Sequence, residues 1–308
     1  MAAIERTVRI FRESGSHGRL LLDDGERLLD LSAHLMQHGQ PTDLVDLLTS
    51  DWFAGARLDP LLPKEDWDEW DDWTGLDLEW DGNAPEGVTT PVPPSAVGKI
   101  LALGKNFRAH AEEFNEEVPE EPLFFNKLPE TLTAHKTDVT IPDWYTARVD
   151  HEAELAVVIS RTGYRIAKET AMEHVGGYCV ANDLTARSIQ GWDRKKQYPW
   201  FRAKNMDGFC PLGPCFVPRD FLDISNLRVT AHVNGELRQD ASTRDLVVDV
   251  PTALAWLSRH LTLRPGDIVL MGTPAGVGPL EDGDEVVCAV EGIGELTTTI
   301  RRPAGDSQ

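Results

Sequence analysis

Short apolar runs separated by turn residues open the chain. Residues 8–11, 20–22 and 28–31 are mostly apolar, and an Asp-Asp-Gly turn lies at 23–25. Short apolar runs bounded by glycine, serine and aspartate predict strands joined by tight turns. An apolar patch at residues 44–48 predicts a helix. The first part of the chain therefore predicts a small domain of mixed α and β structure.

A proline-rich stretch at residues 91–94, Pro-Val-Pro-Pro, interrupts this pattern. Such a stretch is stiff, so we place a domain boundary there. The predicted domains are a small N-terminal α+β domain at 1–92 and a larger domain at 93–304. The larger domain is expected to be mainly β with some α structure. Its pattern predicts strands at 99–103, 154–160, 268–271, 285–290 and 295–300, helices at 106–117 and 252–261, and a helix running into a strand over 169–179.

The segment from Lys64 to Asp81 is acidic and rich in tryptophan. Trp67, Trp70 and Trp73 recur at every third position, so they share one face of a predicted short helix. Aromatic packing beneath a solvated acidic face is the favoured interpretation. A surface that stacks on a sugar or binds a partner is the alternative.

The overall charge limits the partners of the chain. It has 308 residues with 30 Lys and Arg against 51 Asp and Glu, which gives a formal net charge of −21. Such a surface repels a phosphate backbone and an anionic membrane, so neither nucleic acid nor a membrane is expected as a partner. It also repels an acidic small molecule, so a site for one must carry its own positive charge.

Cysteine usage indicates a reducing compartment. The four cysteines, at positions 179, 210, 215 and 288, form no Cys-x-x-Cys pair. We therefore expect reduced thiols and a cytoplasmic location, not a disulfide framework or a zinc site. The start of the chain lacks the basic and apolar segments of a secretion signal, and no apolar run is long enough to span a bilayer.

Two glutamates lie two positions apart in the apolar strand over residues 150–159. Side chains at i and i+2 of a strand point to the same side, so Glu152 and Glu154 face the same way. Neighbouring carboxylates repel each other unless a positive charge lies between them, and a hard divalent cation is the usual partner. An exposed strand face is the alternative, and the spacing alone favours it. Asp183 follows another apolar strand as a third candidate, with a turn or helix cap as its alternative.

Four further residues, in three segments, carry candidate chemistry. His110 and Glu113, at i and i+3 of the predicted helix, have the spacing of a base and the carboxylate that orients it. Lys204 stands before a Gly/Pro-rich turn and has the charge to hold an oxyanion. Thr273 lies in the glycine-rich loop 272–278, which suits close approach to a small ligand. The alternatives are a surface helix pair, a surface lysine and a structural turn.

Five motifs, taken in order, resemble the fumarylacetoacetate hydrolase family. They are Gly-Lys-Asn-Phe-Arg-Ala-His at 104–110, Asp-His-Glu-Ala-Glu-Leu-Ala-Val-Val-Ile at 150–159, Asn-Asp-Leu-Thr-Ala-Arg at 182–187, Lys-Asn-Met-Asp-Gly-Phe-Cys-Pro-Leu-Gly-Pro at 204–214 and Gly-Thr-Pro-Ala-Gly-Val-Gly at 272–278. The resemblance covers roughly the last two-thirds of the chain, which is a domain-scale match. It implies a mixed β-sandwich roll preceded by a variable N-terminal domain, a homodimer, and an active site in the mouth of the roll.

The resemblance also implies roles for individual residues. Glu152, Glu154 and Asp183 look like the metal ligands, with Mg²⁺ as the usual metal and Mn²⁺ or Ca²⁺ as substitutes. Positions implied for catalysis and substrate binding are His110 with Glu113 as the dyad, Lys204 as the active-site lysine, Gln190 and Thr273 at the substrate, and Arg187 supporting the last ligand or the substrate. The chain departs from the family pattern at Phe107, Asn205 and Leu128, which concerns substrate identity and not the fold.

The function implied is a divalent-metal-dependent hydrolase. It would cleave a C–C bond in a small acidic 1,3-dicarbonyl, such as an acylpyruvate or fumarylpyruvate, through an enolate held by the metal. The alternatives are an isomerase or decarboxylase of a hydroxymuconate-like or 2-oxo diacid in aromatic catabolism, and a sugar-acid dehydratase. A non-catalytic scaffold is the rival from another class, but a scaffold has no need for mutually repulsive carboxylates.

Overall fold

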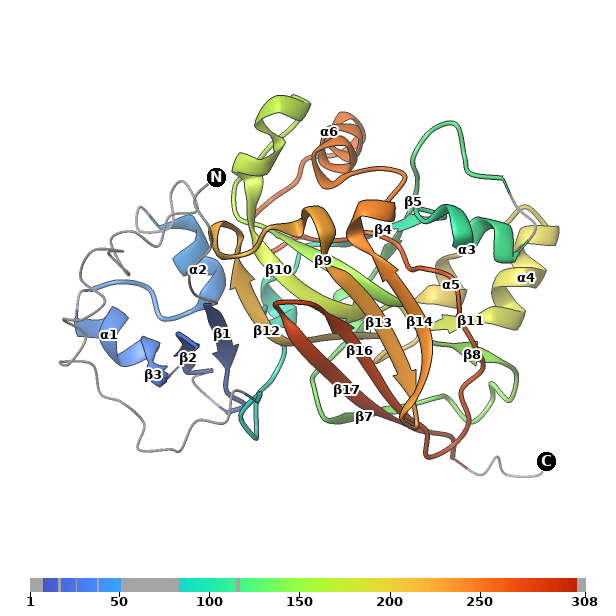
Figure 1. The fold of residues 1–308 in the computed structure, drawn as a ribbon, viewed down its shortest axis with the longest axis horizontal. Helices are drawn as coiled ribbons and strands as arrows, with labels where there is room; N and C mark the ends of the chain where they lie inside the picture. The colour runs from blue at the N-terminus through green and yellow to red at the C-terminus, as the bar shows by residue number, and fades with distance from the viewer. Residues whose placement is uncertain are drawn as a thin grey trace.

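The computed structural model describes residues 8–15, 18–25, 27–37, 39–50, 83–114 and 117–303. The tryptophan-rich segment lies outside these residues, so its predicted helix and its interpretation stay predictions. Among the residues described, no helix is long and apolar enough to cross a membrane. Figure 1 shows a chain built mainly of β-sheets with short helices around them.

The larger sheet of the described chain has ten strands. Across the sheet they run β3 (Leu28–Asp30), β2 (Leu20–Asp23), β1 (Arg9–Arg12), β12 (Cys210–Pro218), β10 (Val175–Asn182), β9 (Ala153–Ile159), β15 (Ile268–Leu270), β4 (Ile100–Gly104) and β5 (Leu123–Lys127), and β6 (Leu132–Thr133) pairs with β12. The pairs β15–β4 and β12–β6 are parallel, and the other neighbours are antiparallel. The sheet is therefore mixed.

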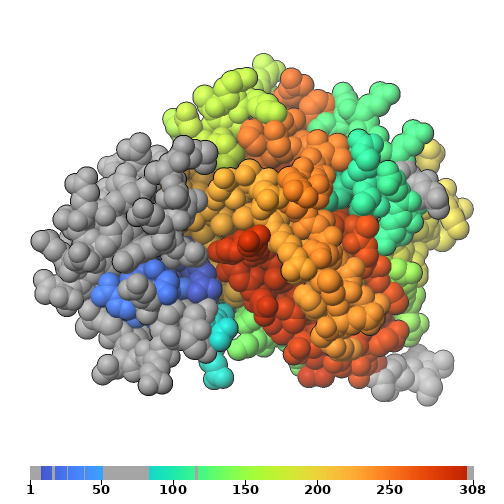
Figure 2. All heavy atoms as spheres, viewed as in Figure 1, coloured from blue at the N-terminus to red at the C-terminus, as the bar shows by residue number. Residues whose placement is uncertain are grey.

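A second sheet packs across the first. Its five strands run β14 (Glu236–Ser242), β13 (Arg228–Val233), β16 (Glu285–Val290), β17 (Gly294–Arg301) and β7 (Thr137–Thr140), and a short pair joins β11 (Thr185–Ala186) to β8 (Val149–Asp150). Burial alternates along β16 and β17, as expected for a sheet with one face on the core and one in water. Figure 2 shows that the outer face of this sheet forms part of the molecular surface.

The helices are short. The α-helices are α1 (Leu31–Gln37), α2 (Leu44–Thr49), α3 (Arg108–Glu113), α4 (Arg187–Lys195), α5 (Phe201–Lys204) and α6 (Val250–His260). The 3-10 helices are η2 (Pro94–Ala96), η3 (Pro129–Thr131), η4 (Lys168–His174), η5 (Arg219–Phe221), η6 (Ile224–Asn226) and η7 (Thr243–Asp245). Helices α3, α4 and α5 lie together at one end of the molecule (Figure 1).

Strand β9 lies in the middle of the large sheet and is buried along its whole length. Leu155 and Val157 on one face join the core that the two sheets share. Ala156 and Val158 on the other face join a second core, to which Leu47 of α2 belongs. Because both faces of β9 are covered, its sequence is a nearly continuous apolar run. Its acidic residue, Glu154, lies near its start.

The structure confirms most of the predicted elements of the larger domain and adjusts their ends. The helix expected at 106–117 is only α3, because Phe107 is extended and bridges to Leu246. The helix expected at 252–261 begins at Val250, because Asp249 caps the Thr252 amide. The helical start of 169–179 is the 3-10 helix η4, and β10 follows it.

The N-terminal strands extend the large sheet. Strand β1 is antiparallel to β12, with Ile10 opposite Phe216. Strands β2 and β3 then continue the sheet outward from β1. Strands on the two sides of the predicted boundary at residues 92 and 93 are thus hydrogen-bonded in one sheet. The division into two domains stays a prediction.

Buried His135 gives the fold a pH-dependent contribution to stability. Burial, and to a smaller extent the charge of Lys136, lower the pKa of His135 to about 4, and its Nδ1 accepts the Thr297 amide at 3.1 Å. Between pH 6.5 and 4 the unfolded chain binds a proton that the folded chain excludes, so stability falls as pH falls. We expect this histidine to account for a loss of about 2 kcal/mol in unfolding free energy between pH 7 and pH 5.

The measurement is urea unfolding at both pH values for wild type and His135→Asn. The asparagine Oδ1 keeps an acceptor for the Thr297 amide but does not titrate. Between pH 7 and pH 5 the unfolding free energy of the variant should fall by about 2 kcal/mol less than that of wild type, whatever the stability of the variant at pH 7. Equal losses in the two proteins would show that His135 does not carry this pH dependence.

Candidate metal centre and active site

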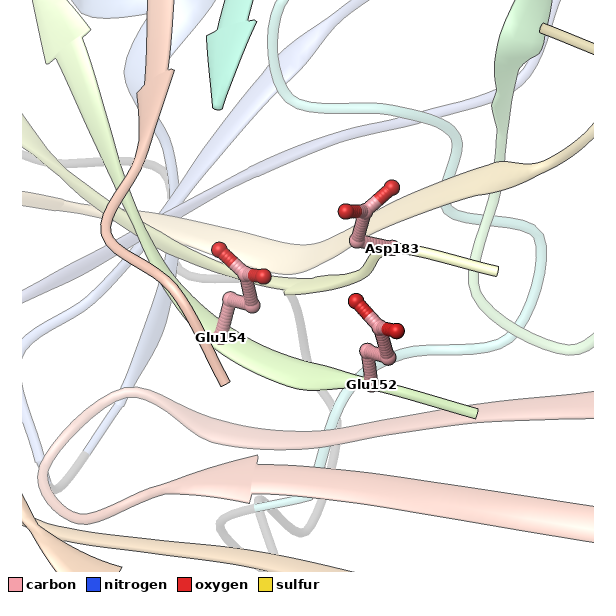
Figure 3. Close-up of side chains that lie close together, drawn as sticks. All are labelled: Glu152, Glu154 and Asp183. Atoms are coloured by element: carbon pink, nitrogen blue, oxygen red, sulfur yellow. The ribbon is translucent and has the colours of Figure 1, made fainter. Parts of the chain in front are cut away.

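Three carboxylates meet at the ends of two paired strands. Glu152 precedes β9, Glu154 lies within it, and Asp183 follows β10. The antiparallel register places Ala181 opposite Glu154, and the Asp183 amide donates to the Glu152 carbonyl at 2.8 Å. One oxygen from each carboxylate lies within 4.8 Å of the others (Figure 3). Strand pairing thus brings together acids that are far apart in the sequence.

All three carboxylates are buried. Glu152 is 4 % exposed, and Glu154 and Asp183 are each 1 % exposed. The exposed strand face that the spacing alone favoured is therefore wrong. Three buried acids side by side are unfavourable unless positive charge offsets them.

Two buried lysines supply part of that charge. Lys204 at the end of α5 donates from Nζ to Glu152 Oε2 at 2.8 Å and also to Asp183 Oδ2. Lys127 at the end of β5 places Nζ 2.8 Å from Asp183 Oδ1 and donates to the Lys204 carbonyl at 2.5 Å. Both lysines are almost fully buried, so the surface alternative for Lys204 is wrong.

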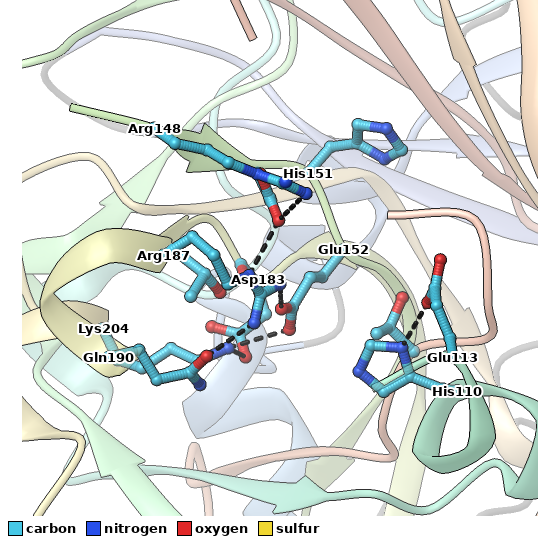
Figure 4. Close-up of polar contacts among 12 residues, drawn as sticks. His110, Glu113, Arg148, His151, Glu152, Asp183, Arg187, Gln190 and Lys204 are labelled. Carbon is cyan, nitrogen blue, oxygen red and sulfur yellow. Dashed lines mark hydrogen bonds and ion pairs between the residues drawn. The ribbon is translucent and has the colours of Figure 1, made fainter. Parts of the chain in front are cut away.

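Arg187 joins the carboxylates to the start of α4. It donates from Nη2 to Glu152 Oε1 at 2.5 Å and from Nε to Asp150 Oδ2 at 2.7 Å. Its third contact, from Nη1 to Gln190 Oε1 at 2.6 Å, orients that amide one turn along the helix (Figure 4). Asp150 is itself buried and also pairs with Arg148 at 2.6 Å. The guanidinium is therefore held in one position.

His110 and Glu113 form the expected pair on α3. His110 Nδ1 lies 3.2 Å from Glu113 Oε2, and the Gly276 amide donates to Glu113 Oε1 at 3.1 Å. His110 is 9 % exposed and packs edge-on against Phe114, so the surface-pair alternative is wrong. Its ring lies on the side of Glu113 that faces Glu152 (Figure 4).

The loop after β15 closes over the start of β9. The Gly272 amide donates to Glu154 Oε2 at 2.6 Å, and Thr273 Oγ1 donates to the Ala153 carbonyl at 3.0 Å. Gly272 has φ +90°, and a Cβ there would lie 2.8 Å from the Asn106 Cβ, so both conformation and space require glycine. The loop thus places a backbone donor on one of the three carboxylates.

Eight of the nine predicted site residues line one cleft, and Glu113 lies behind His110. The cleft is open to solvent, and a ring of polar and charged side chains lines it together with aromatic ones, as in sites for small molecules. The eight lining residues are His110, Glu152, Glu154, Asp183, Arg187, Gln190, Lys204 and Thr273. The site therefore combines an acidic cluster, two kinds of cation and a histidine in one cavity.

Residues 99–301 match the family model described as Fumarylacetoacetate (FAA) hydrolase C-terminal. The chain belongs to the fumarylacetoacetate hydrolase family. Oxaloacetate tautomerase YisK of Bacillus subtilis is 40 % identical over 220 residues, which cover 68 % of this chain and 71 % of YisK. The resemblance seen in the motifs is thus shown over residues 99–301.

Solved structures of the family share the fold. A fumarylacetoacetate hydrolase from Exiguobacterium antarcticum is 30 % identical with a TM-score of 0.78, over 96 % of this chain and 100 % of its own. A fumarylpyruvate hydrolase from Pseudomonas aeruginosa, solved with Mn²⁺ and pyruvate, is 33 % identical with a TM-score of 0.64, over 67 % of this chain and 90 % of its own. The predicted mainly β fold is confirmed, and the chain is an enzyme of a family that uses a divalent metal.

The electrostatic environments of the two glutamates in the site differ. Burial, together with the charges of Asp183 and Glu152, raises the pKa of Glu154 well above its usual value. Burial would also raise the pKa of Glu152, but Lys204 and Arg187 outweigh it and hold that pKa below its usual range. Burial opposes the charge on Lys204, yet the two acids it contacts raise its pKa. Glu154 is therefore the carboxylate whose charged form the surrounding protein stabilises least.

The donor set fits a hard divalent cation. Asp183 Oδ1 is buried and lies 2.8 Å from Lys127 Nζ, and the three carboxylates offer oxygen atoms within 4.8 Å of one another. Carboxylate oxygens are the ligands that Mg²⁺, Mn²⁺ and Ca²⁺ prefer. A dication between the acids would relieve the repulsion that raises the pKa of Glu154. The structure thus fits the expected cofactor class without selecting one metal.

Several residues of this site were not predicted from the sequence. Lys127, next to the departure at Leu128, was not proposed for the site, and Asp150 appeared only as the first residue of the motif at 150–159. Gln239 of β14 is fully buried and donates to Thr273 Oγ1 at 2.8 Å while it accepts the Ala153 amide at 3.0 Å. No local signal distinguishes such residues, because their partners come from distant segments.

Proposed function

We propose that the enzyme is a divalent-metal-dependent hydrolase that cleaves a C–C bond in a small acidic 1,3-dicarbonyl of the acylpyruvate or fumarylpyruvate kind. The observation that supports this most directly is that the buried acid cluster and the His110–Glu113 pair face the same cavity. Hydrolysis of such a substrate needs both a Lewis acid at the 2-oxo acid and a base for water.

Glu152, Glu154 and Asp183 would hold the metal, with Mg²⁺ or Mn²⁺ as the candidates. When bound there, the cation would supply Lewis acidity that polarises the carbonyl of a 2-oxo acid. The protein itself supplies cations beside the acids, at Lys204 and Arg187. The carboxylate of the substrate would therefore enter a site with local positive charge, despite the acidic surface.

His110 would accept a proton from water. Burial is the main reason that the pKa of His110 lies below its usual value, so the ring is neutral at pH 7. With Nδ1–H donating to Glu113, the other nitrogen, Nε2, is the basic one. Glu113 is in turn fixed by the Gly276 amide, which limits the ring to one orientation.

The bond changes follow from this arrangement. The hydroxide formed at His110 adds to the distal carbonyl. The C–C bond then breaks, and its electron pair stays with the pyruvate fragment as an enolate, whose negative charge lies mainly on oxygen. Lys204 Nζ and the Gln190 amide would stabilise that oxygen. Because Gln190 Oε1 accepts from Arg187, the amide presents Nε2 as its donor. The proton that His110 accepted from water then passes to the enolate carbon, which completes the release of pyruvate and an acid.

Keto–enol proton transfer on oxaloacetate is the second candidate. It is favoured by the 40 % identity to oxaloacetate tautomerase YisK. The same base would then move a proton between carbon 3 and the carbonyl oxygen, with no water added. Isomerisation or decarboxylation of a related diacid would use the same enolate chemistry.

The test is turnover of acetylpyruvate, fumarylpyruvate and oxaloacetate, each with Mg²⁺, Mn²⁺ or EDTA, followed by enol absorbance and product analysis. We expect pyruvate and the matching acid from an acylpyruvate, with turnover abolished by EDTA. Interconversion of oxaloacetate tautomers without any cleavage of the acylpyruvates would contradict the hydrolase and support the second candidate. Undiminished activity in EDTA would contradict both.

A further inference from the structure

Two further cationic side chains line the cavity besides those that contact the carboxylates. Its lining includes Lys105 and Arg194 as well as the acid cluster. Lys105 follows β4 and is half-buried, and Arg194 lies near the end of α4 and is exposed at the rim. Neither residue takes part in the chemistry described above.

An aromatic wall connects Lys204 to Lys105. Lys204 Nζ lies 4.8 Å from the centre of the Phe125 ring, and the centres of the Phe125 and Trp200 rings are 5.6 Å apart. Trp200 in turn packs on Gly104, where an added Cβ would lie 2.9 Å from the indole. Lys105 is the next residue. The wall therefore runs from the active-site lysine to Lys105, and it offers an apolar surface to a carbon chain.

The backbone holds Lys105 in an unusual conformation. Its φ is 58°, in the left-handed region that residues other than glycine adopt at a cost. Asn106 fixes the turn, because its Nδ2 donates to the Met271 carbonyl at 2.8 Å and its Oδ1 accepts the Val248 amide at 2.8 Å. A strained turn that is clamped in this way places the Lys105 side chain at the cavity.

The two cations repel each other. Burial first, and the charge of Arg194 second, lower the pKa of the Lys105 ammonium. Both side chains line the same cavity, so they give this part of it a positive charge that favours an anionic group of a ligand. The formal net charge of −21 makes local cations necessary for any anionic ligand.

We propose that Lys105 and Arg194 form a second anion subsite, which binds the distal carboxylate of a 2-oxo dicarboxylate while its carbon chain lies along Phe125 and Trp200. The inference rests on the proposed function in one respect, since it takes the acid cluster as the end that holds the 2-oxo acid. It makes the substrate a diacid with a spacer between its two anionic ends, and it disfavours a neutral tail.

The test uses two ligands that the enzyme cannot cleave as 1,3-dicarbonyls. Binding of 2-oxoadipate and 2-oxohexanoate is measured by calorimetry with Mg²⁺ or Mn²⁺ at fixed ionic strength. The two have the same chain length, and only the first has a distal carboxylate. We expect 2-oxoadipate to bind at least about tenfold more tightly, in line with a charge-assisted contact.

Variants of the two residues test whether the subsite causes the tighter binding of 2-oxoadipate. Lys105→Met should remove most of the preference and leave 2-oxohexanoate binding unchanged, while Lys105→Arg should retain it. Arg194→Met should reduce the preference less, by about threefold, because an exposed cation is screened by water. Lys196→Met is the matched control, because Lys196 follows α4, is exposed, and lies over the Trp192 ring at 5.8 Å.

The outcomes separate this inference from the proposed function. Equal binding of both ligands by wild type, or a preference unchanged in Lys105→Met and Arg194→Met, would overturn the subsite and leave the proposed function standing. Loss of the preference in Lys196→Met as well would also overturn it, since general charge would then suffice. If neither 2-oxo acid binds in the presence of metal, the subsite and the proposed function fall together.

Discussion

Replacing His110 with alanine is expected to lower kcat by about 10²- to 10⁴-fold, the usual contribution of a positioned general base. Metal affinity should change little, because His110 contacts Glu113 and Phe114 and is not one of the three clustered acids. The measurements are steady-state kinetics on the substrate that wild type turns over, and calorimetric titration with Mn²⁺. Near-normal turnover in the variant would exclude the water-activating role.

Glu113→Gln is the matched control for this prediction. The glutamine has the same shape but only one carbonyl oxygen, so it can replace Glu113 as acceptor for the Gly276 amide or for His110 Nδ1–H, and it removes the negative charge. That charge raises the pKa of His110 against the larger effect of burial, so its loss should lower the pKa further. Because the neutral ring is the active form, the acid limb of kcat/KM should move to lower pH in Glu113→Gln. A shift to higher pH would contradict the proposed pairing.

The sequence predicts which side chains share a side of a strand, but it does not predict what covers them. Period-two spacing placed Glu152 and Glu154 together, and that is confirmed. The same spacing favoured an exposed face, and the carboxylates are buried. Burial depends on the pairing of β9 with β10 and on the loop after β15, whose Gly272 amide contacts Glu154. These contacts join segments that are far apart in the sequence, so no local pattern predicts them.

The resemblance to the family predicted more residues of the site than periodicity did. It proposed Gln190 and Arg187, and the structure places both at the cavity. It did not propose Lys127, although this lysine lies beside Asp183 and donates to the carbonyl of Lys204, 77 positions along the chain. A single lysine is more often a surface residue than a buried one. Only the tertiary structure separates the two cases.

Lys204→Met is expected to produce the second large effect, on stability as well as on turnover. Methionine has similar length but no charge, so Glu152 and Asp183 would lose the ammonium that lies between them. Removing one partner of a buried ion pair should destabilise the metal-free protein by about 3–5 kcal/mol. Loss of the group that holds the enolate oxygen should also lower kcat by about 10²- to 10³-fold. Urea unfolding in EDTA and steady-state kinetics measure the two effects.

A divalent cation should restore part of the lost stability, and this distinguishes Lys204 from other paired lysines. Positive charge returned to the acid cluster offsets the same repulsion, so Mg²⁺ or Mn²⁺ should raise Tm more in Lys204→Met than in wild type. Lys99→Met is the matched control, since Lys99 pairs with buried Asp267 outside the cavity and metal should not rescue it. An equal rise in Tm for wild type and both variants would show that Lys204 does not offset the charge of the acid cluster. A larger rise confined to Lys204→Met would show that the lysine and the metal act on the same carboxylates.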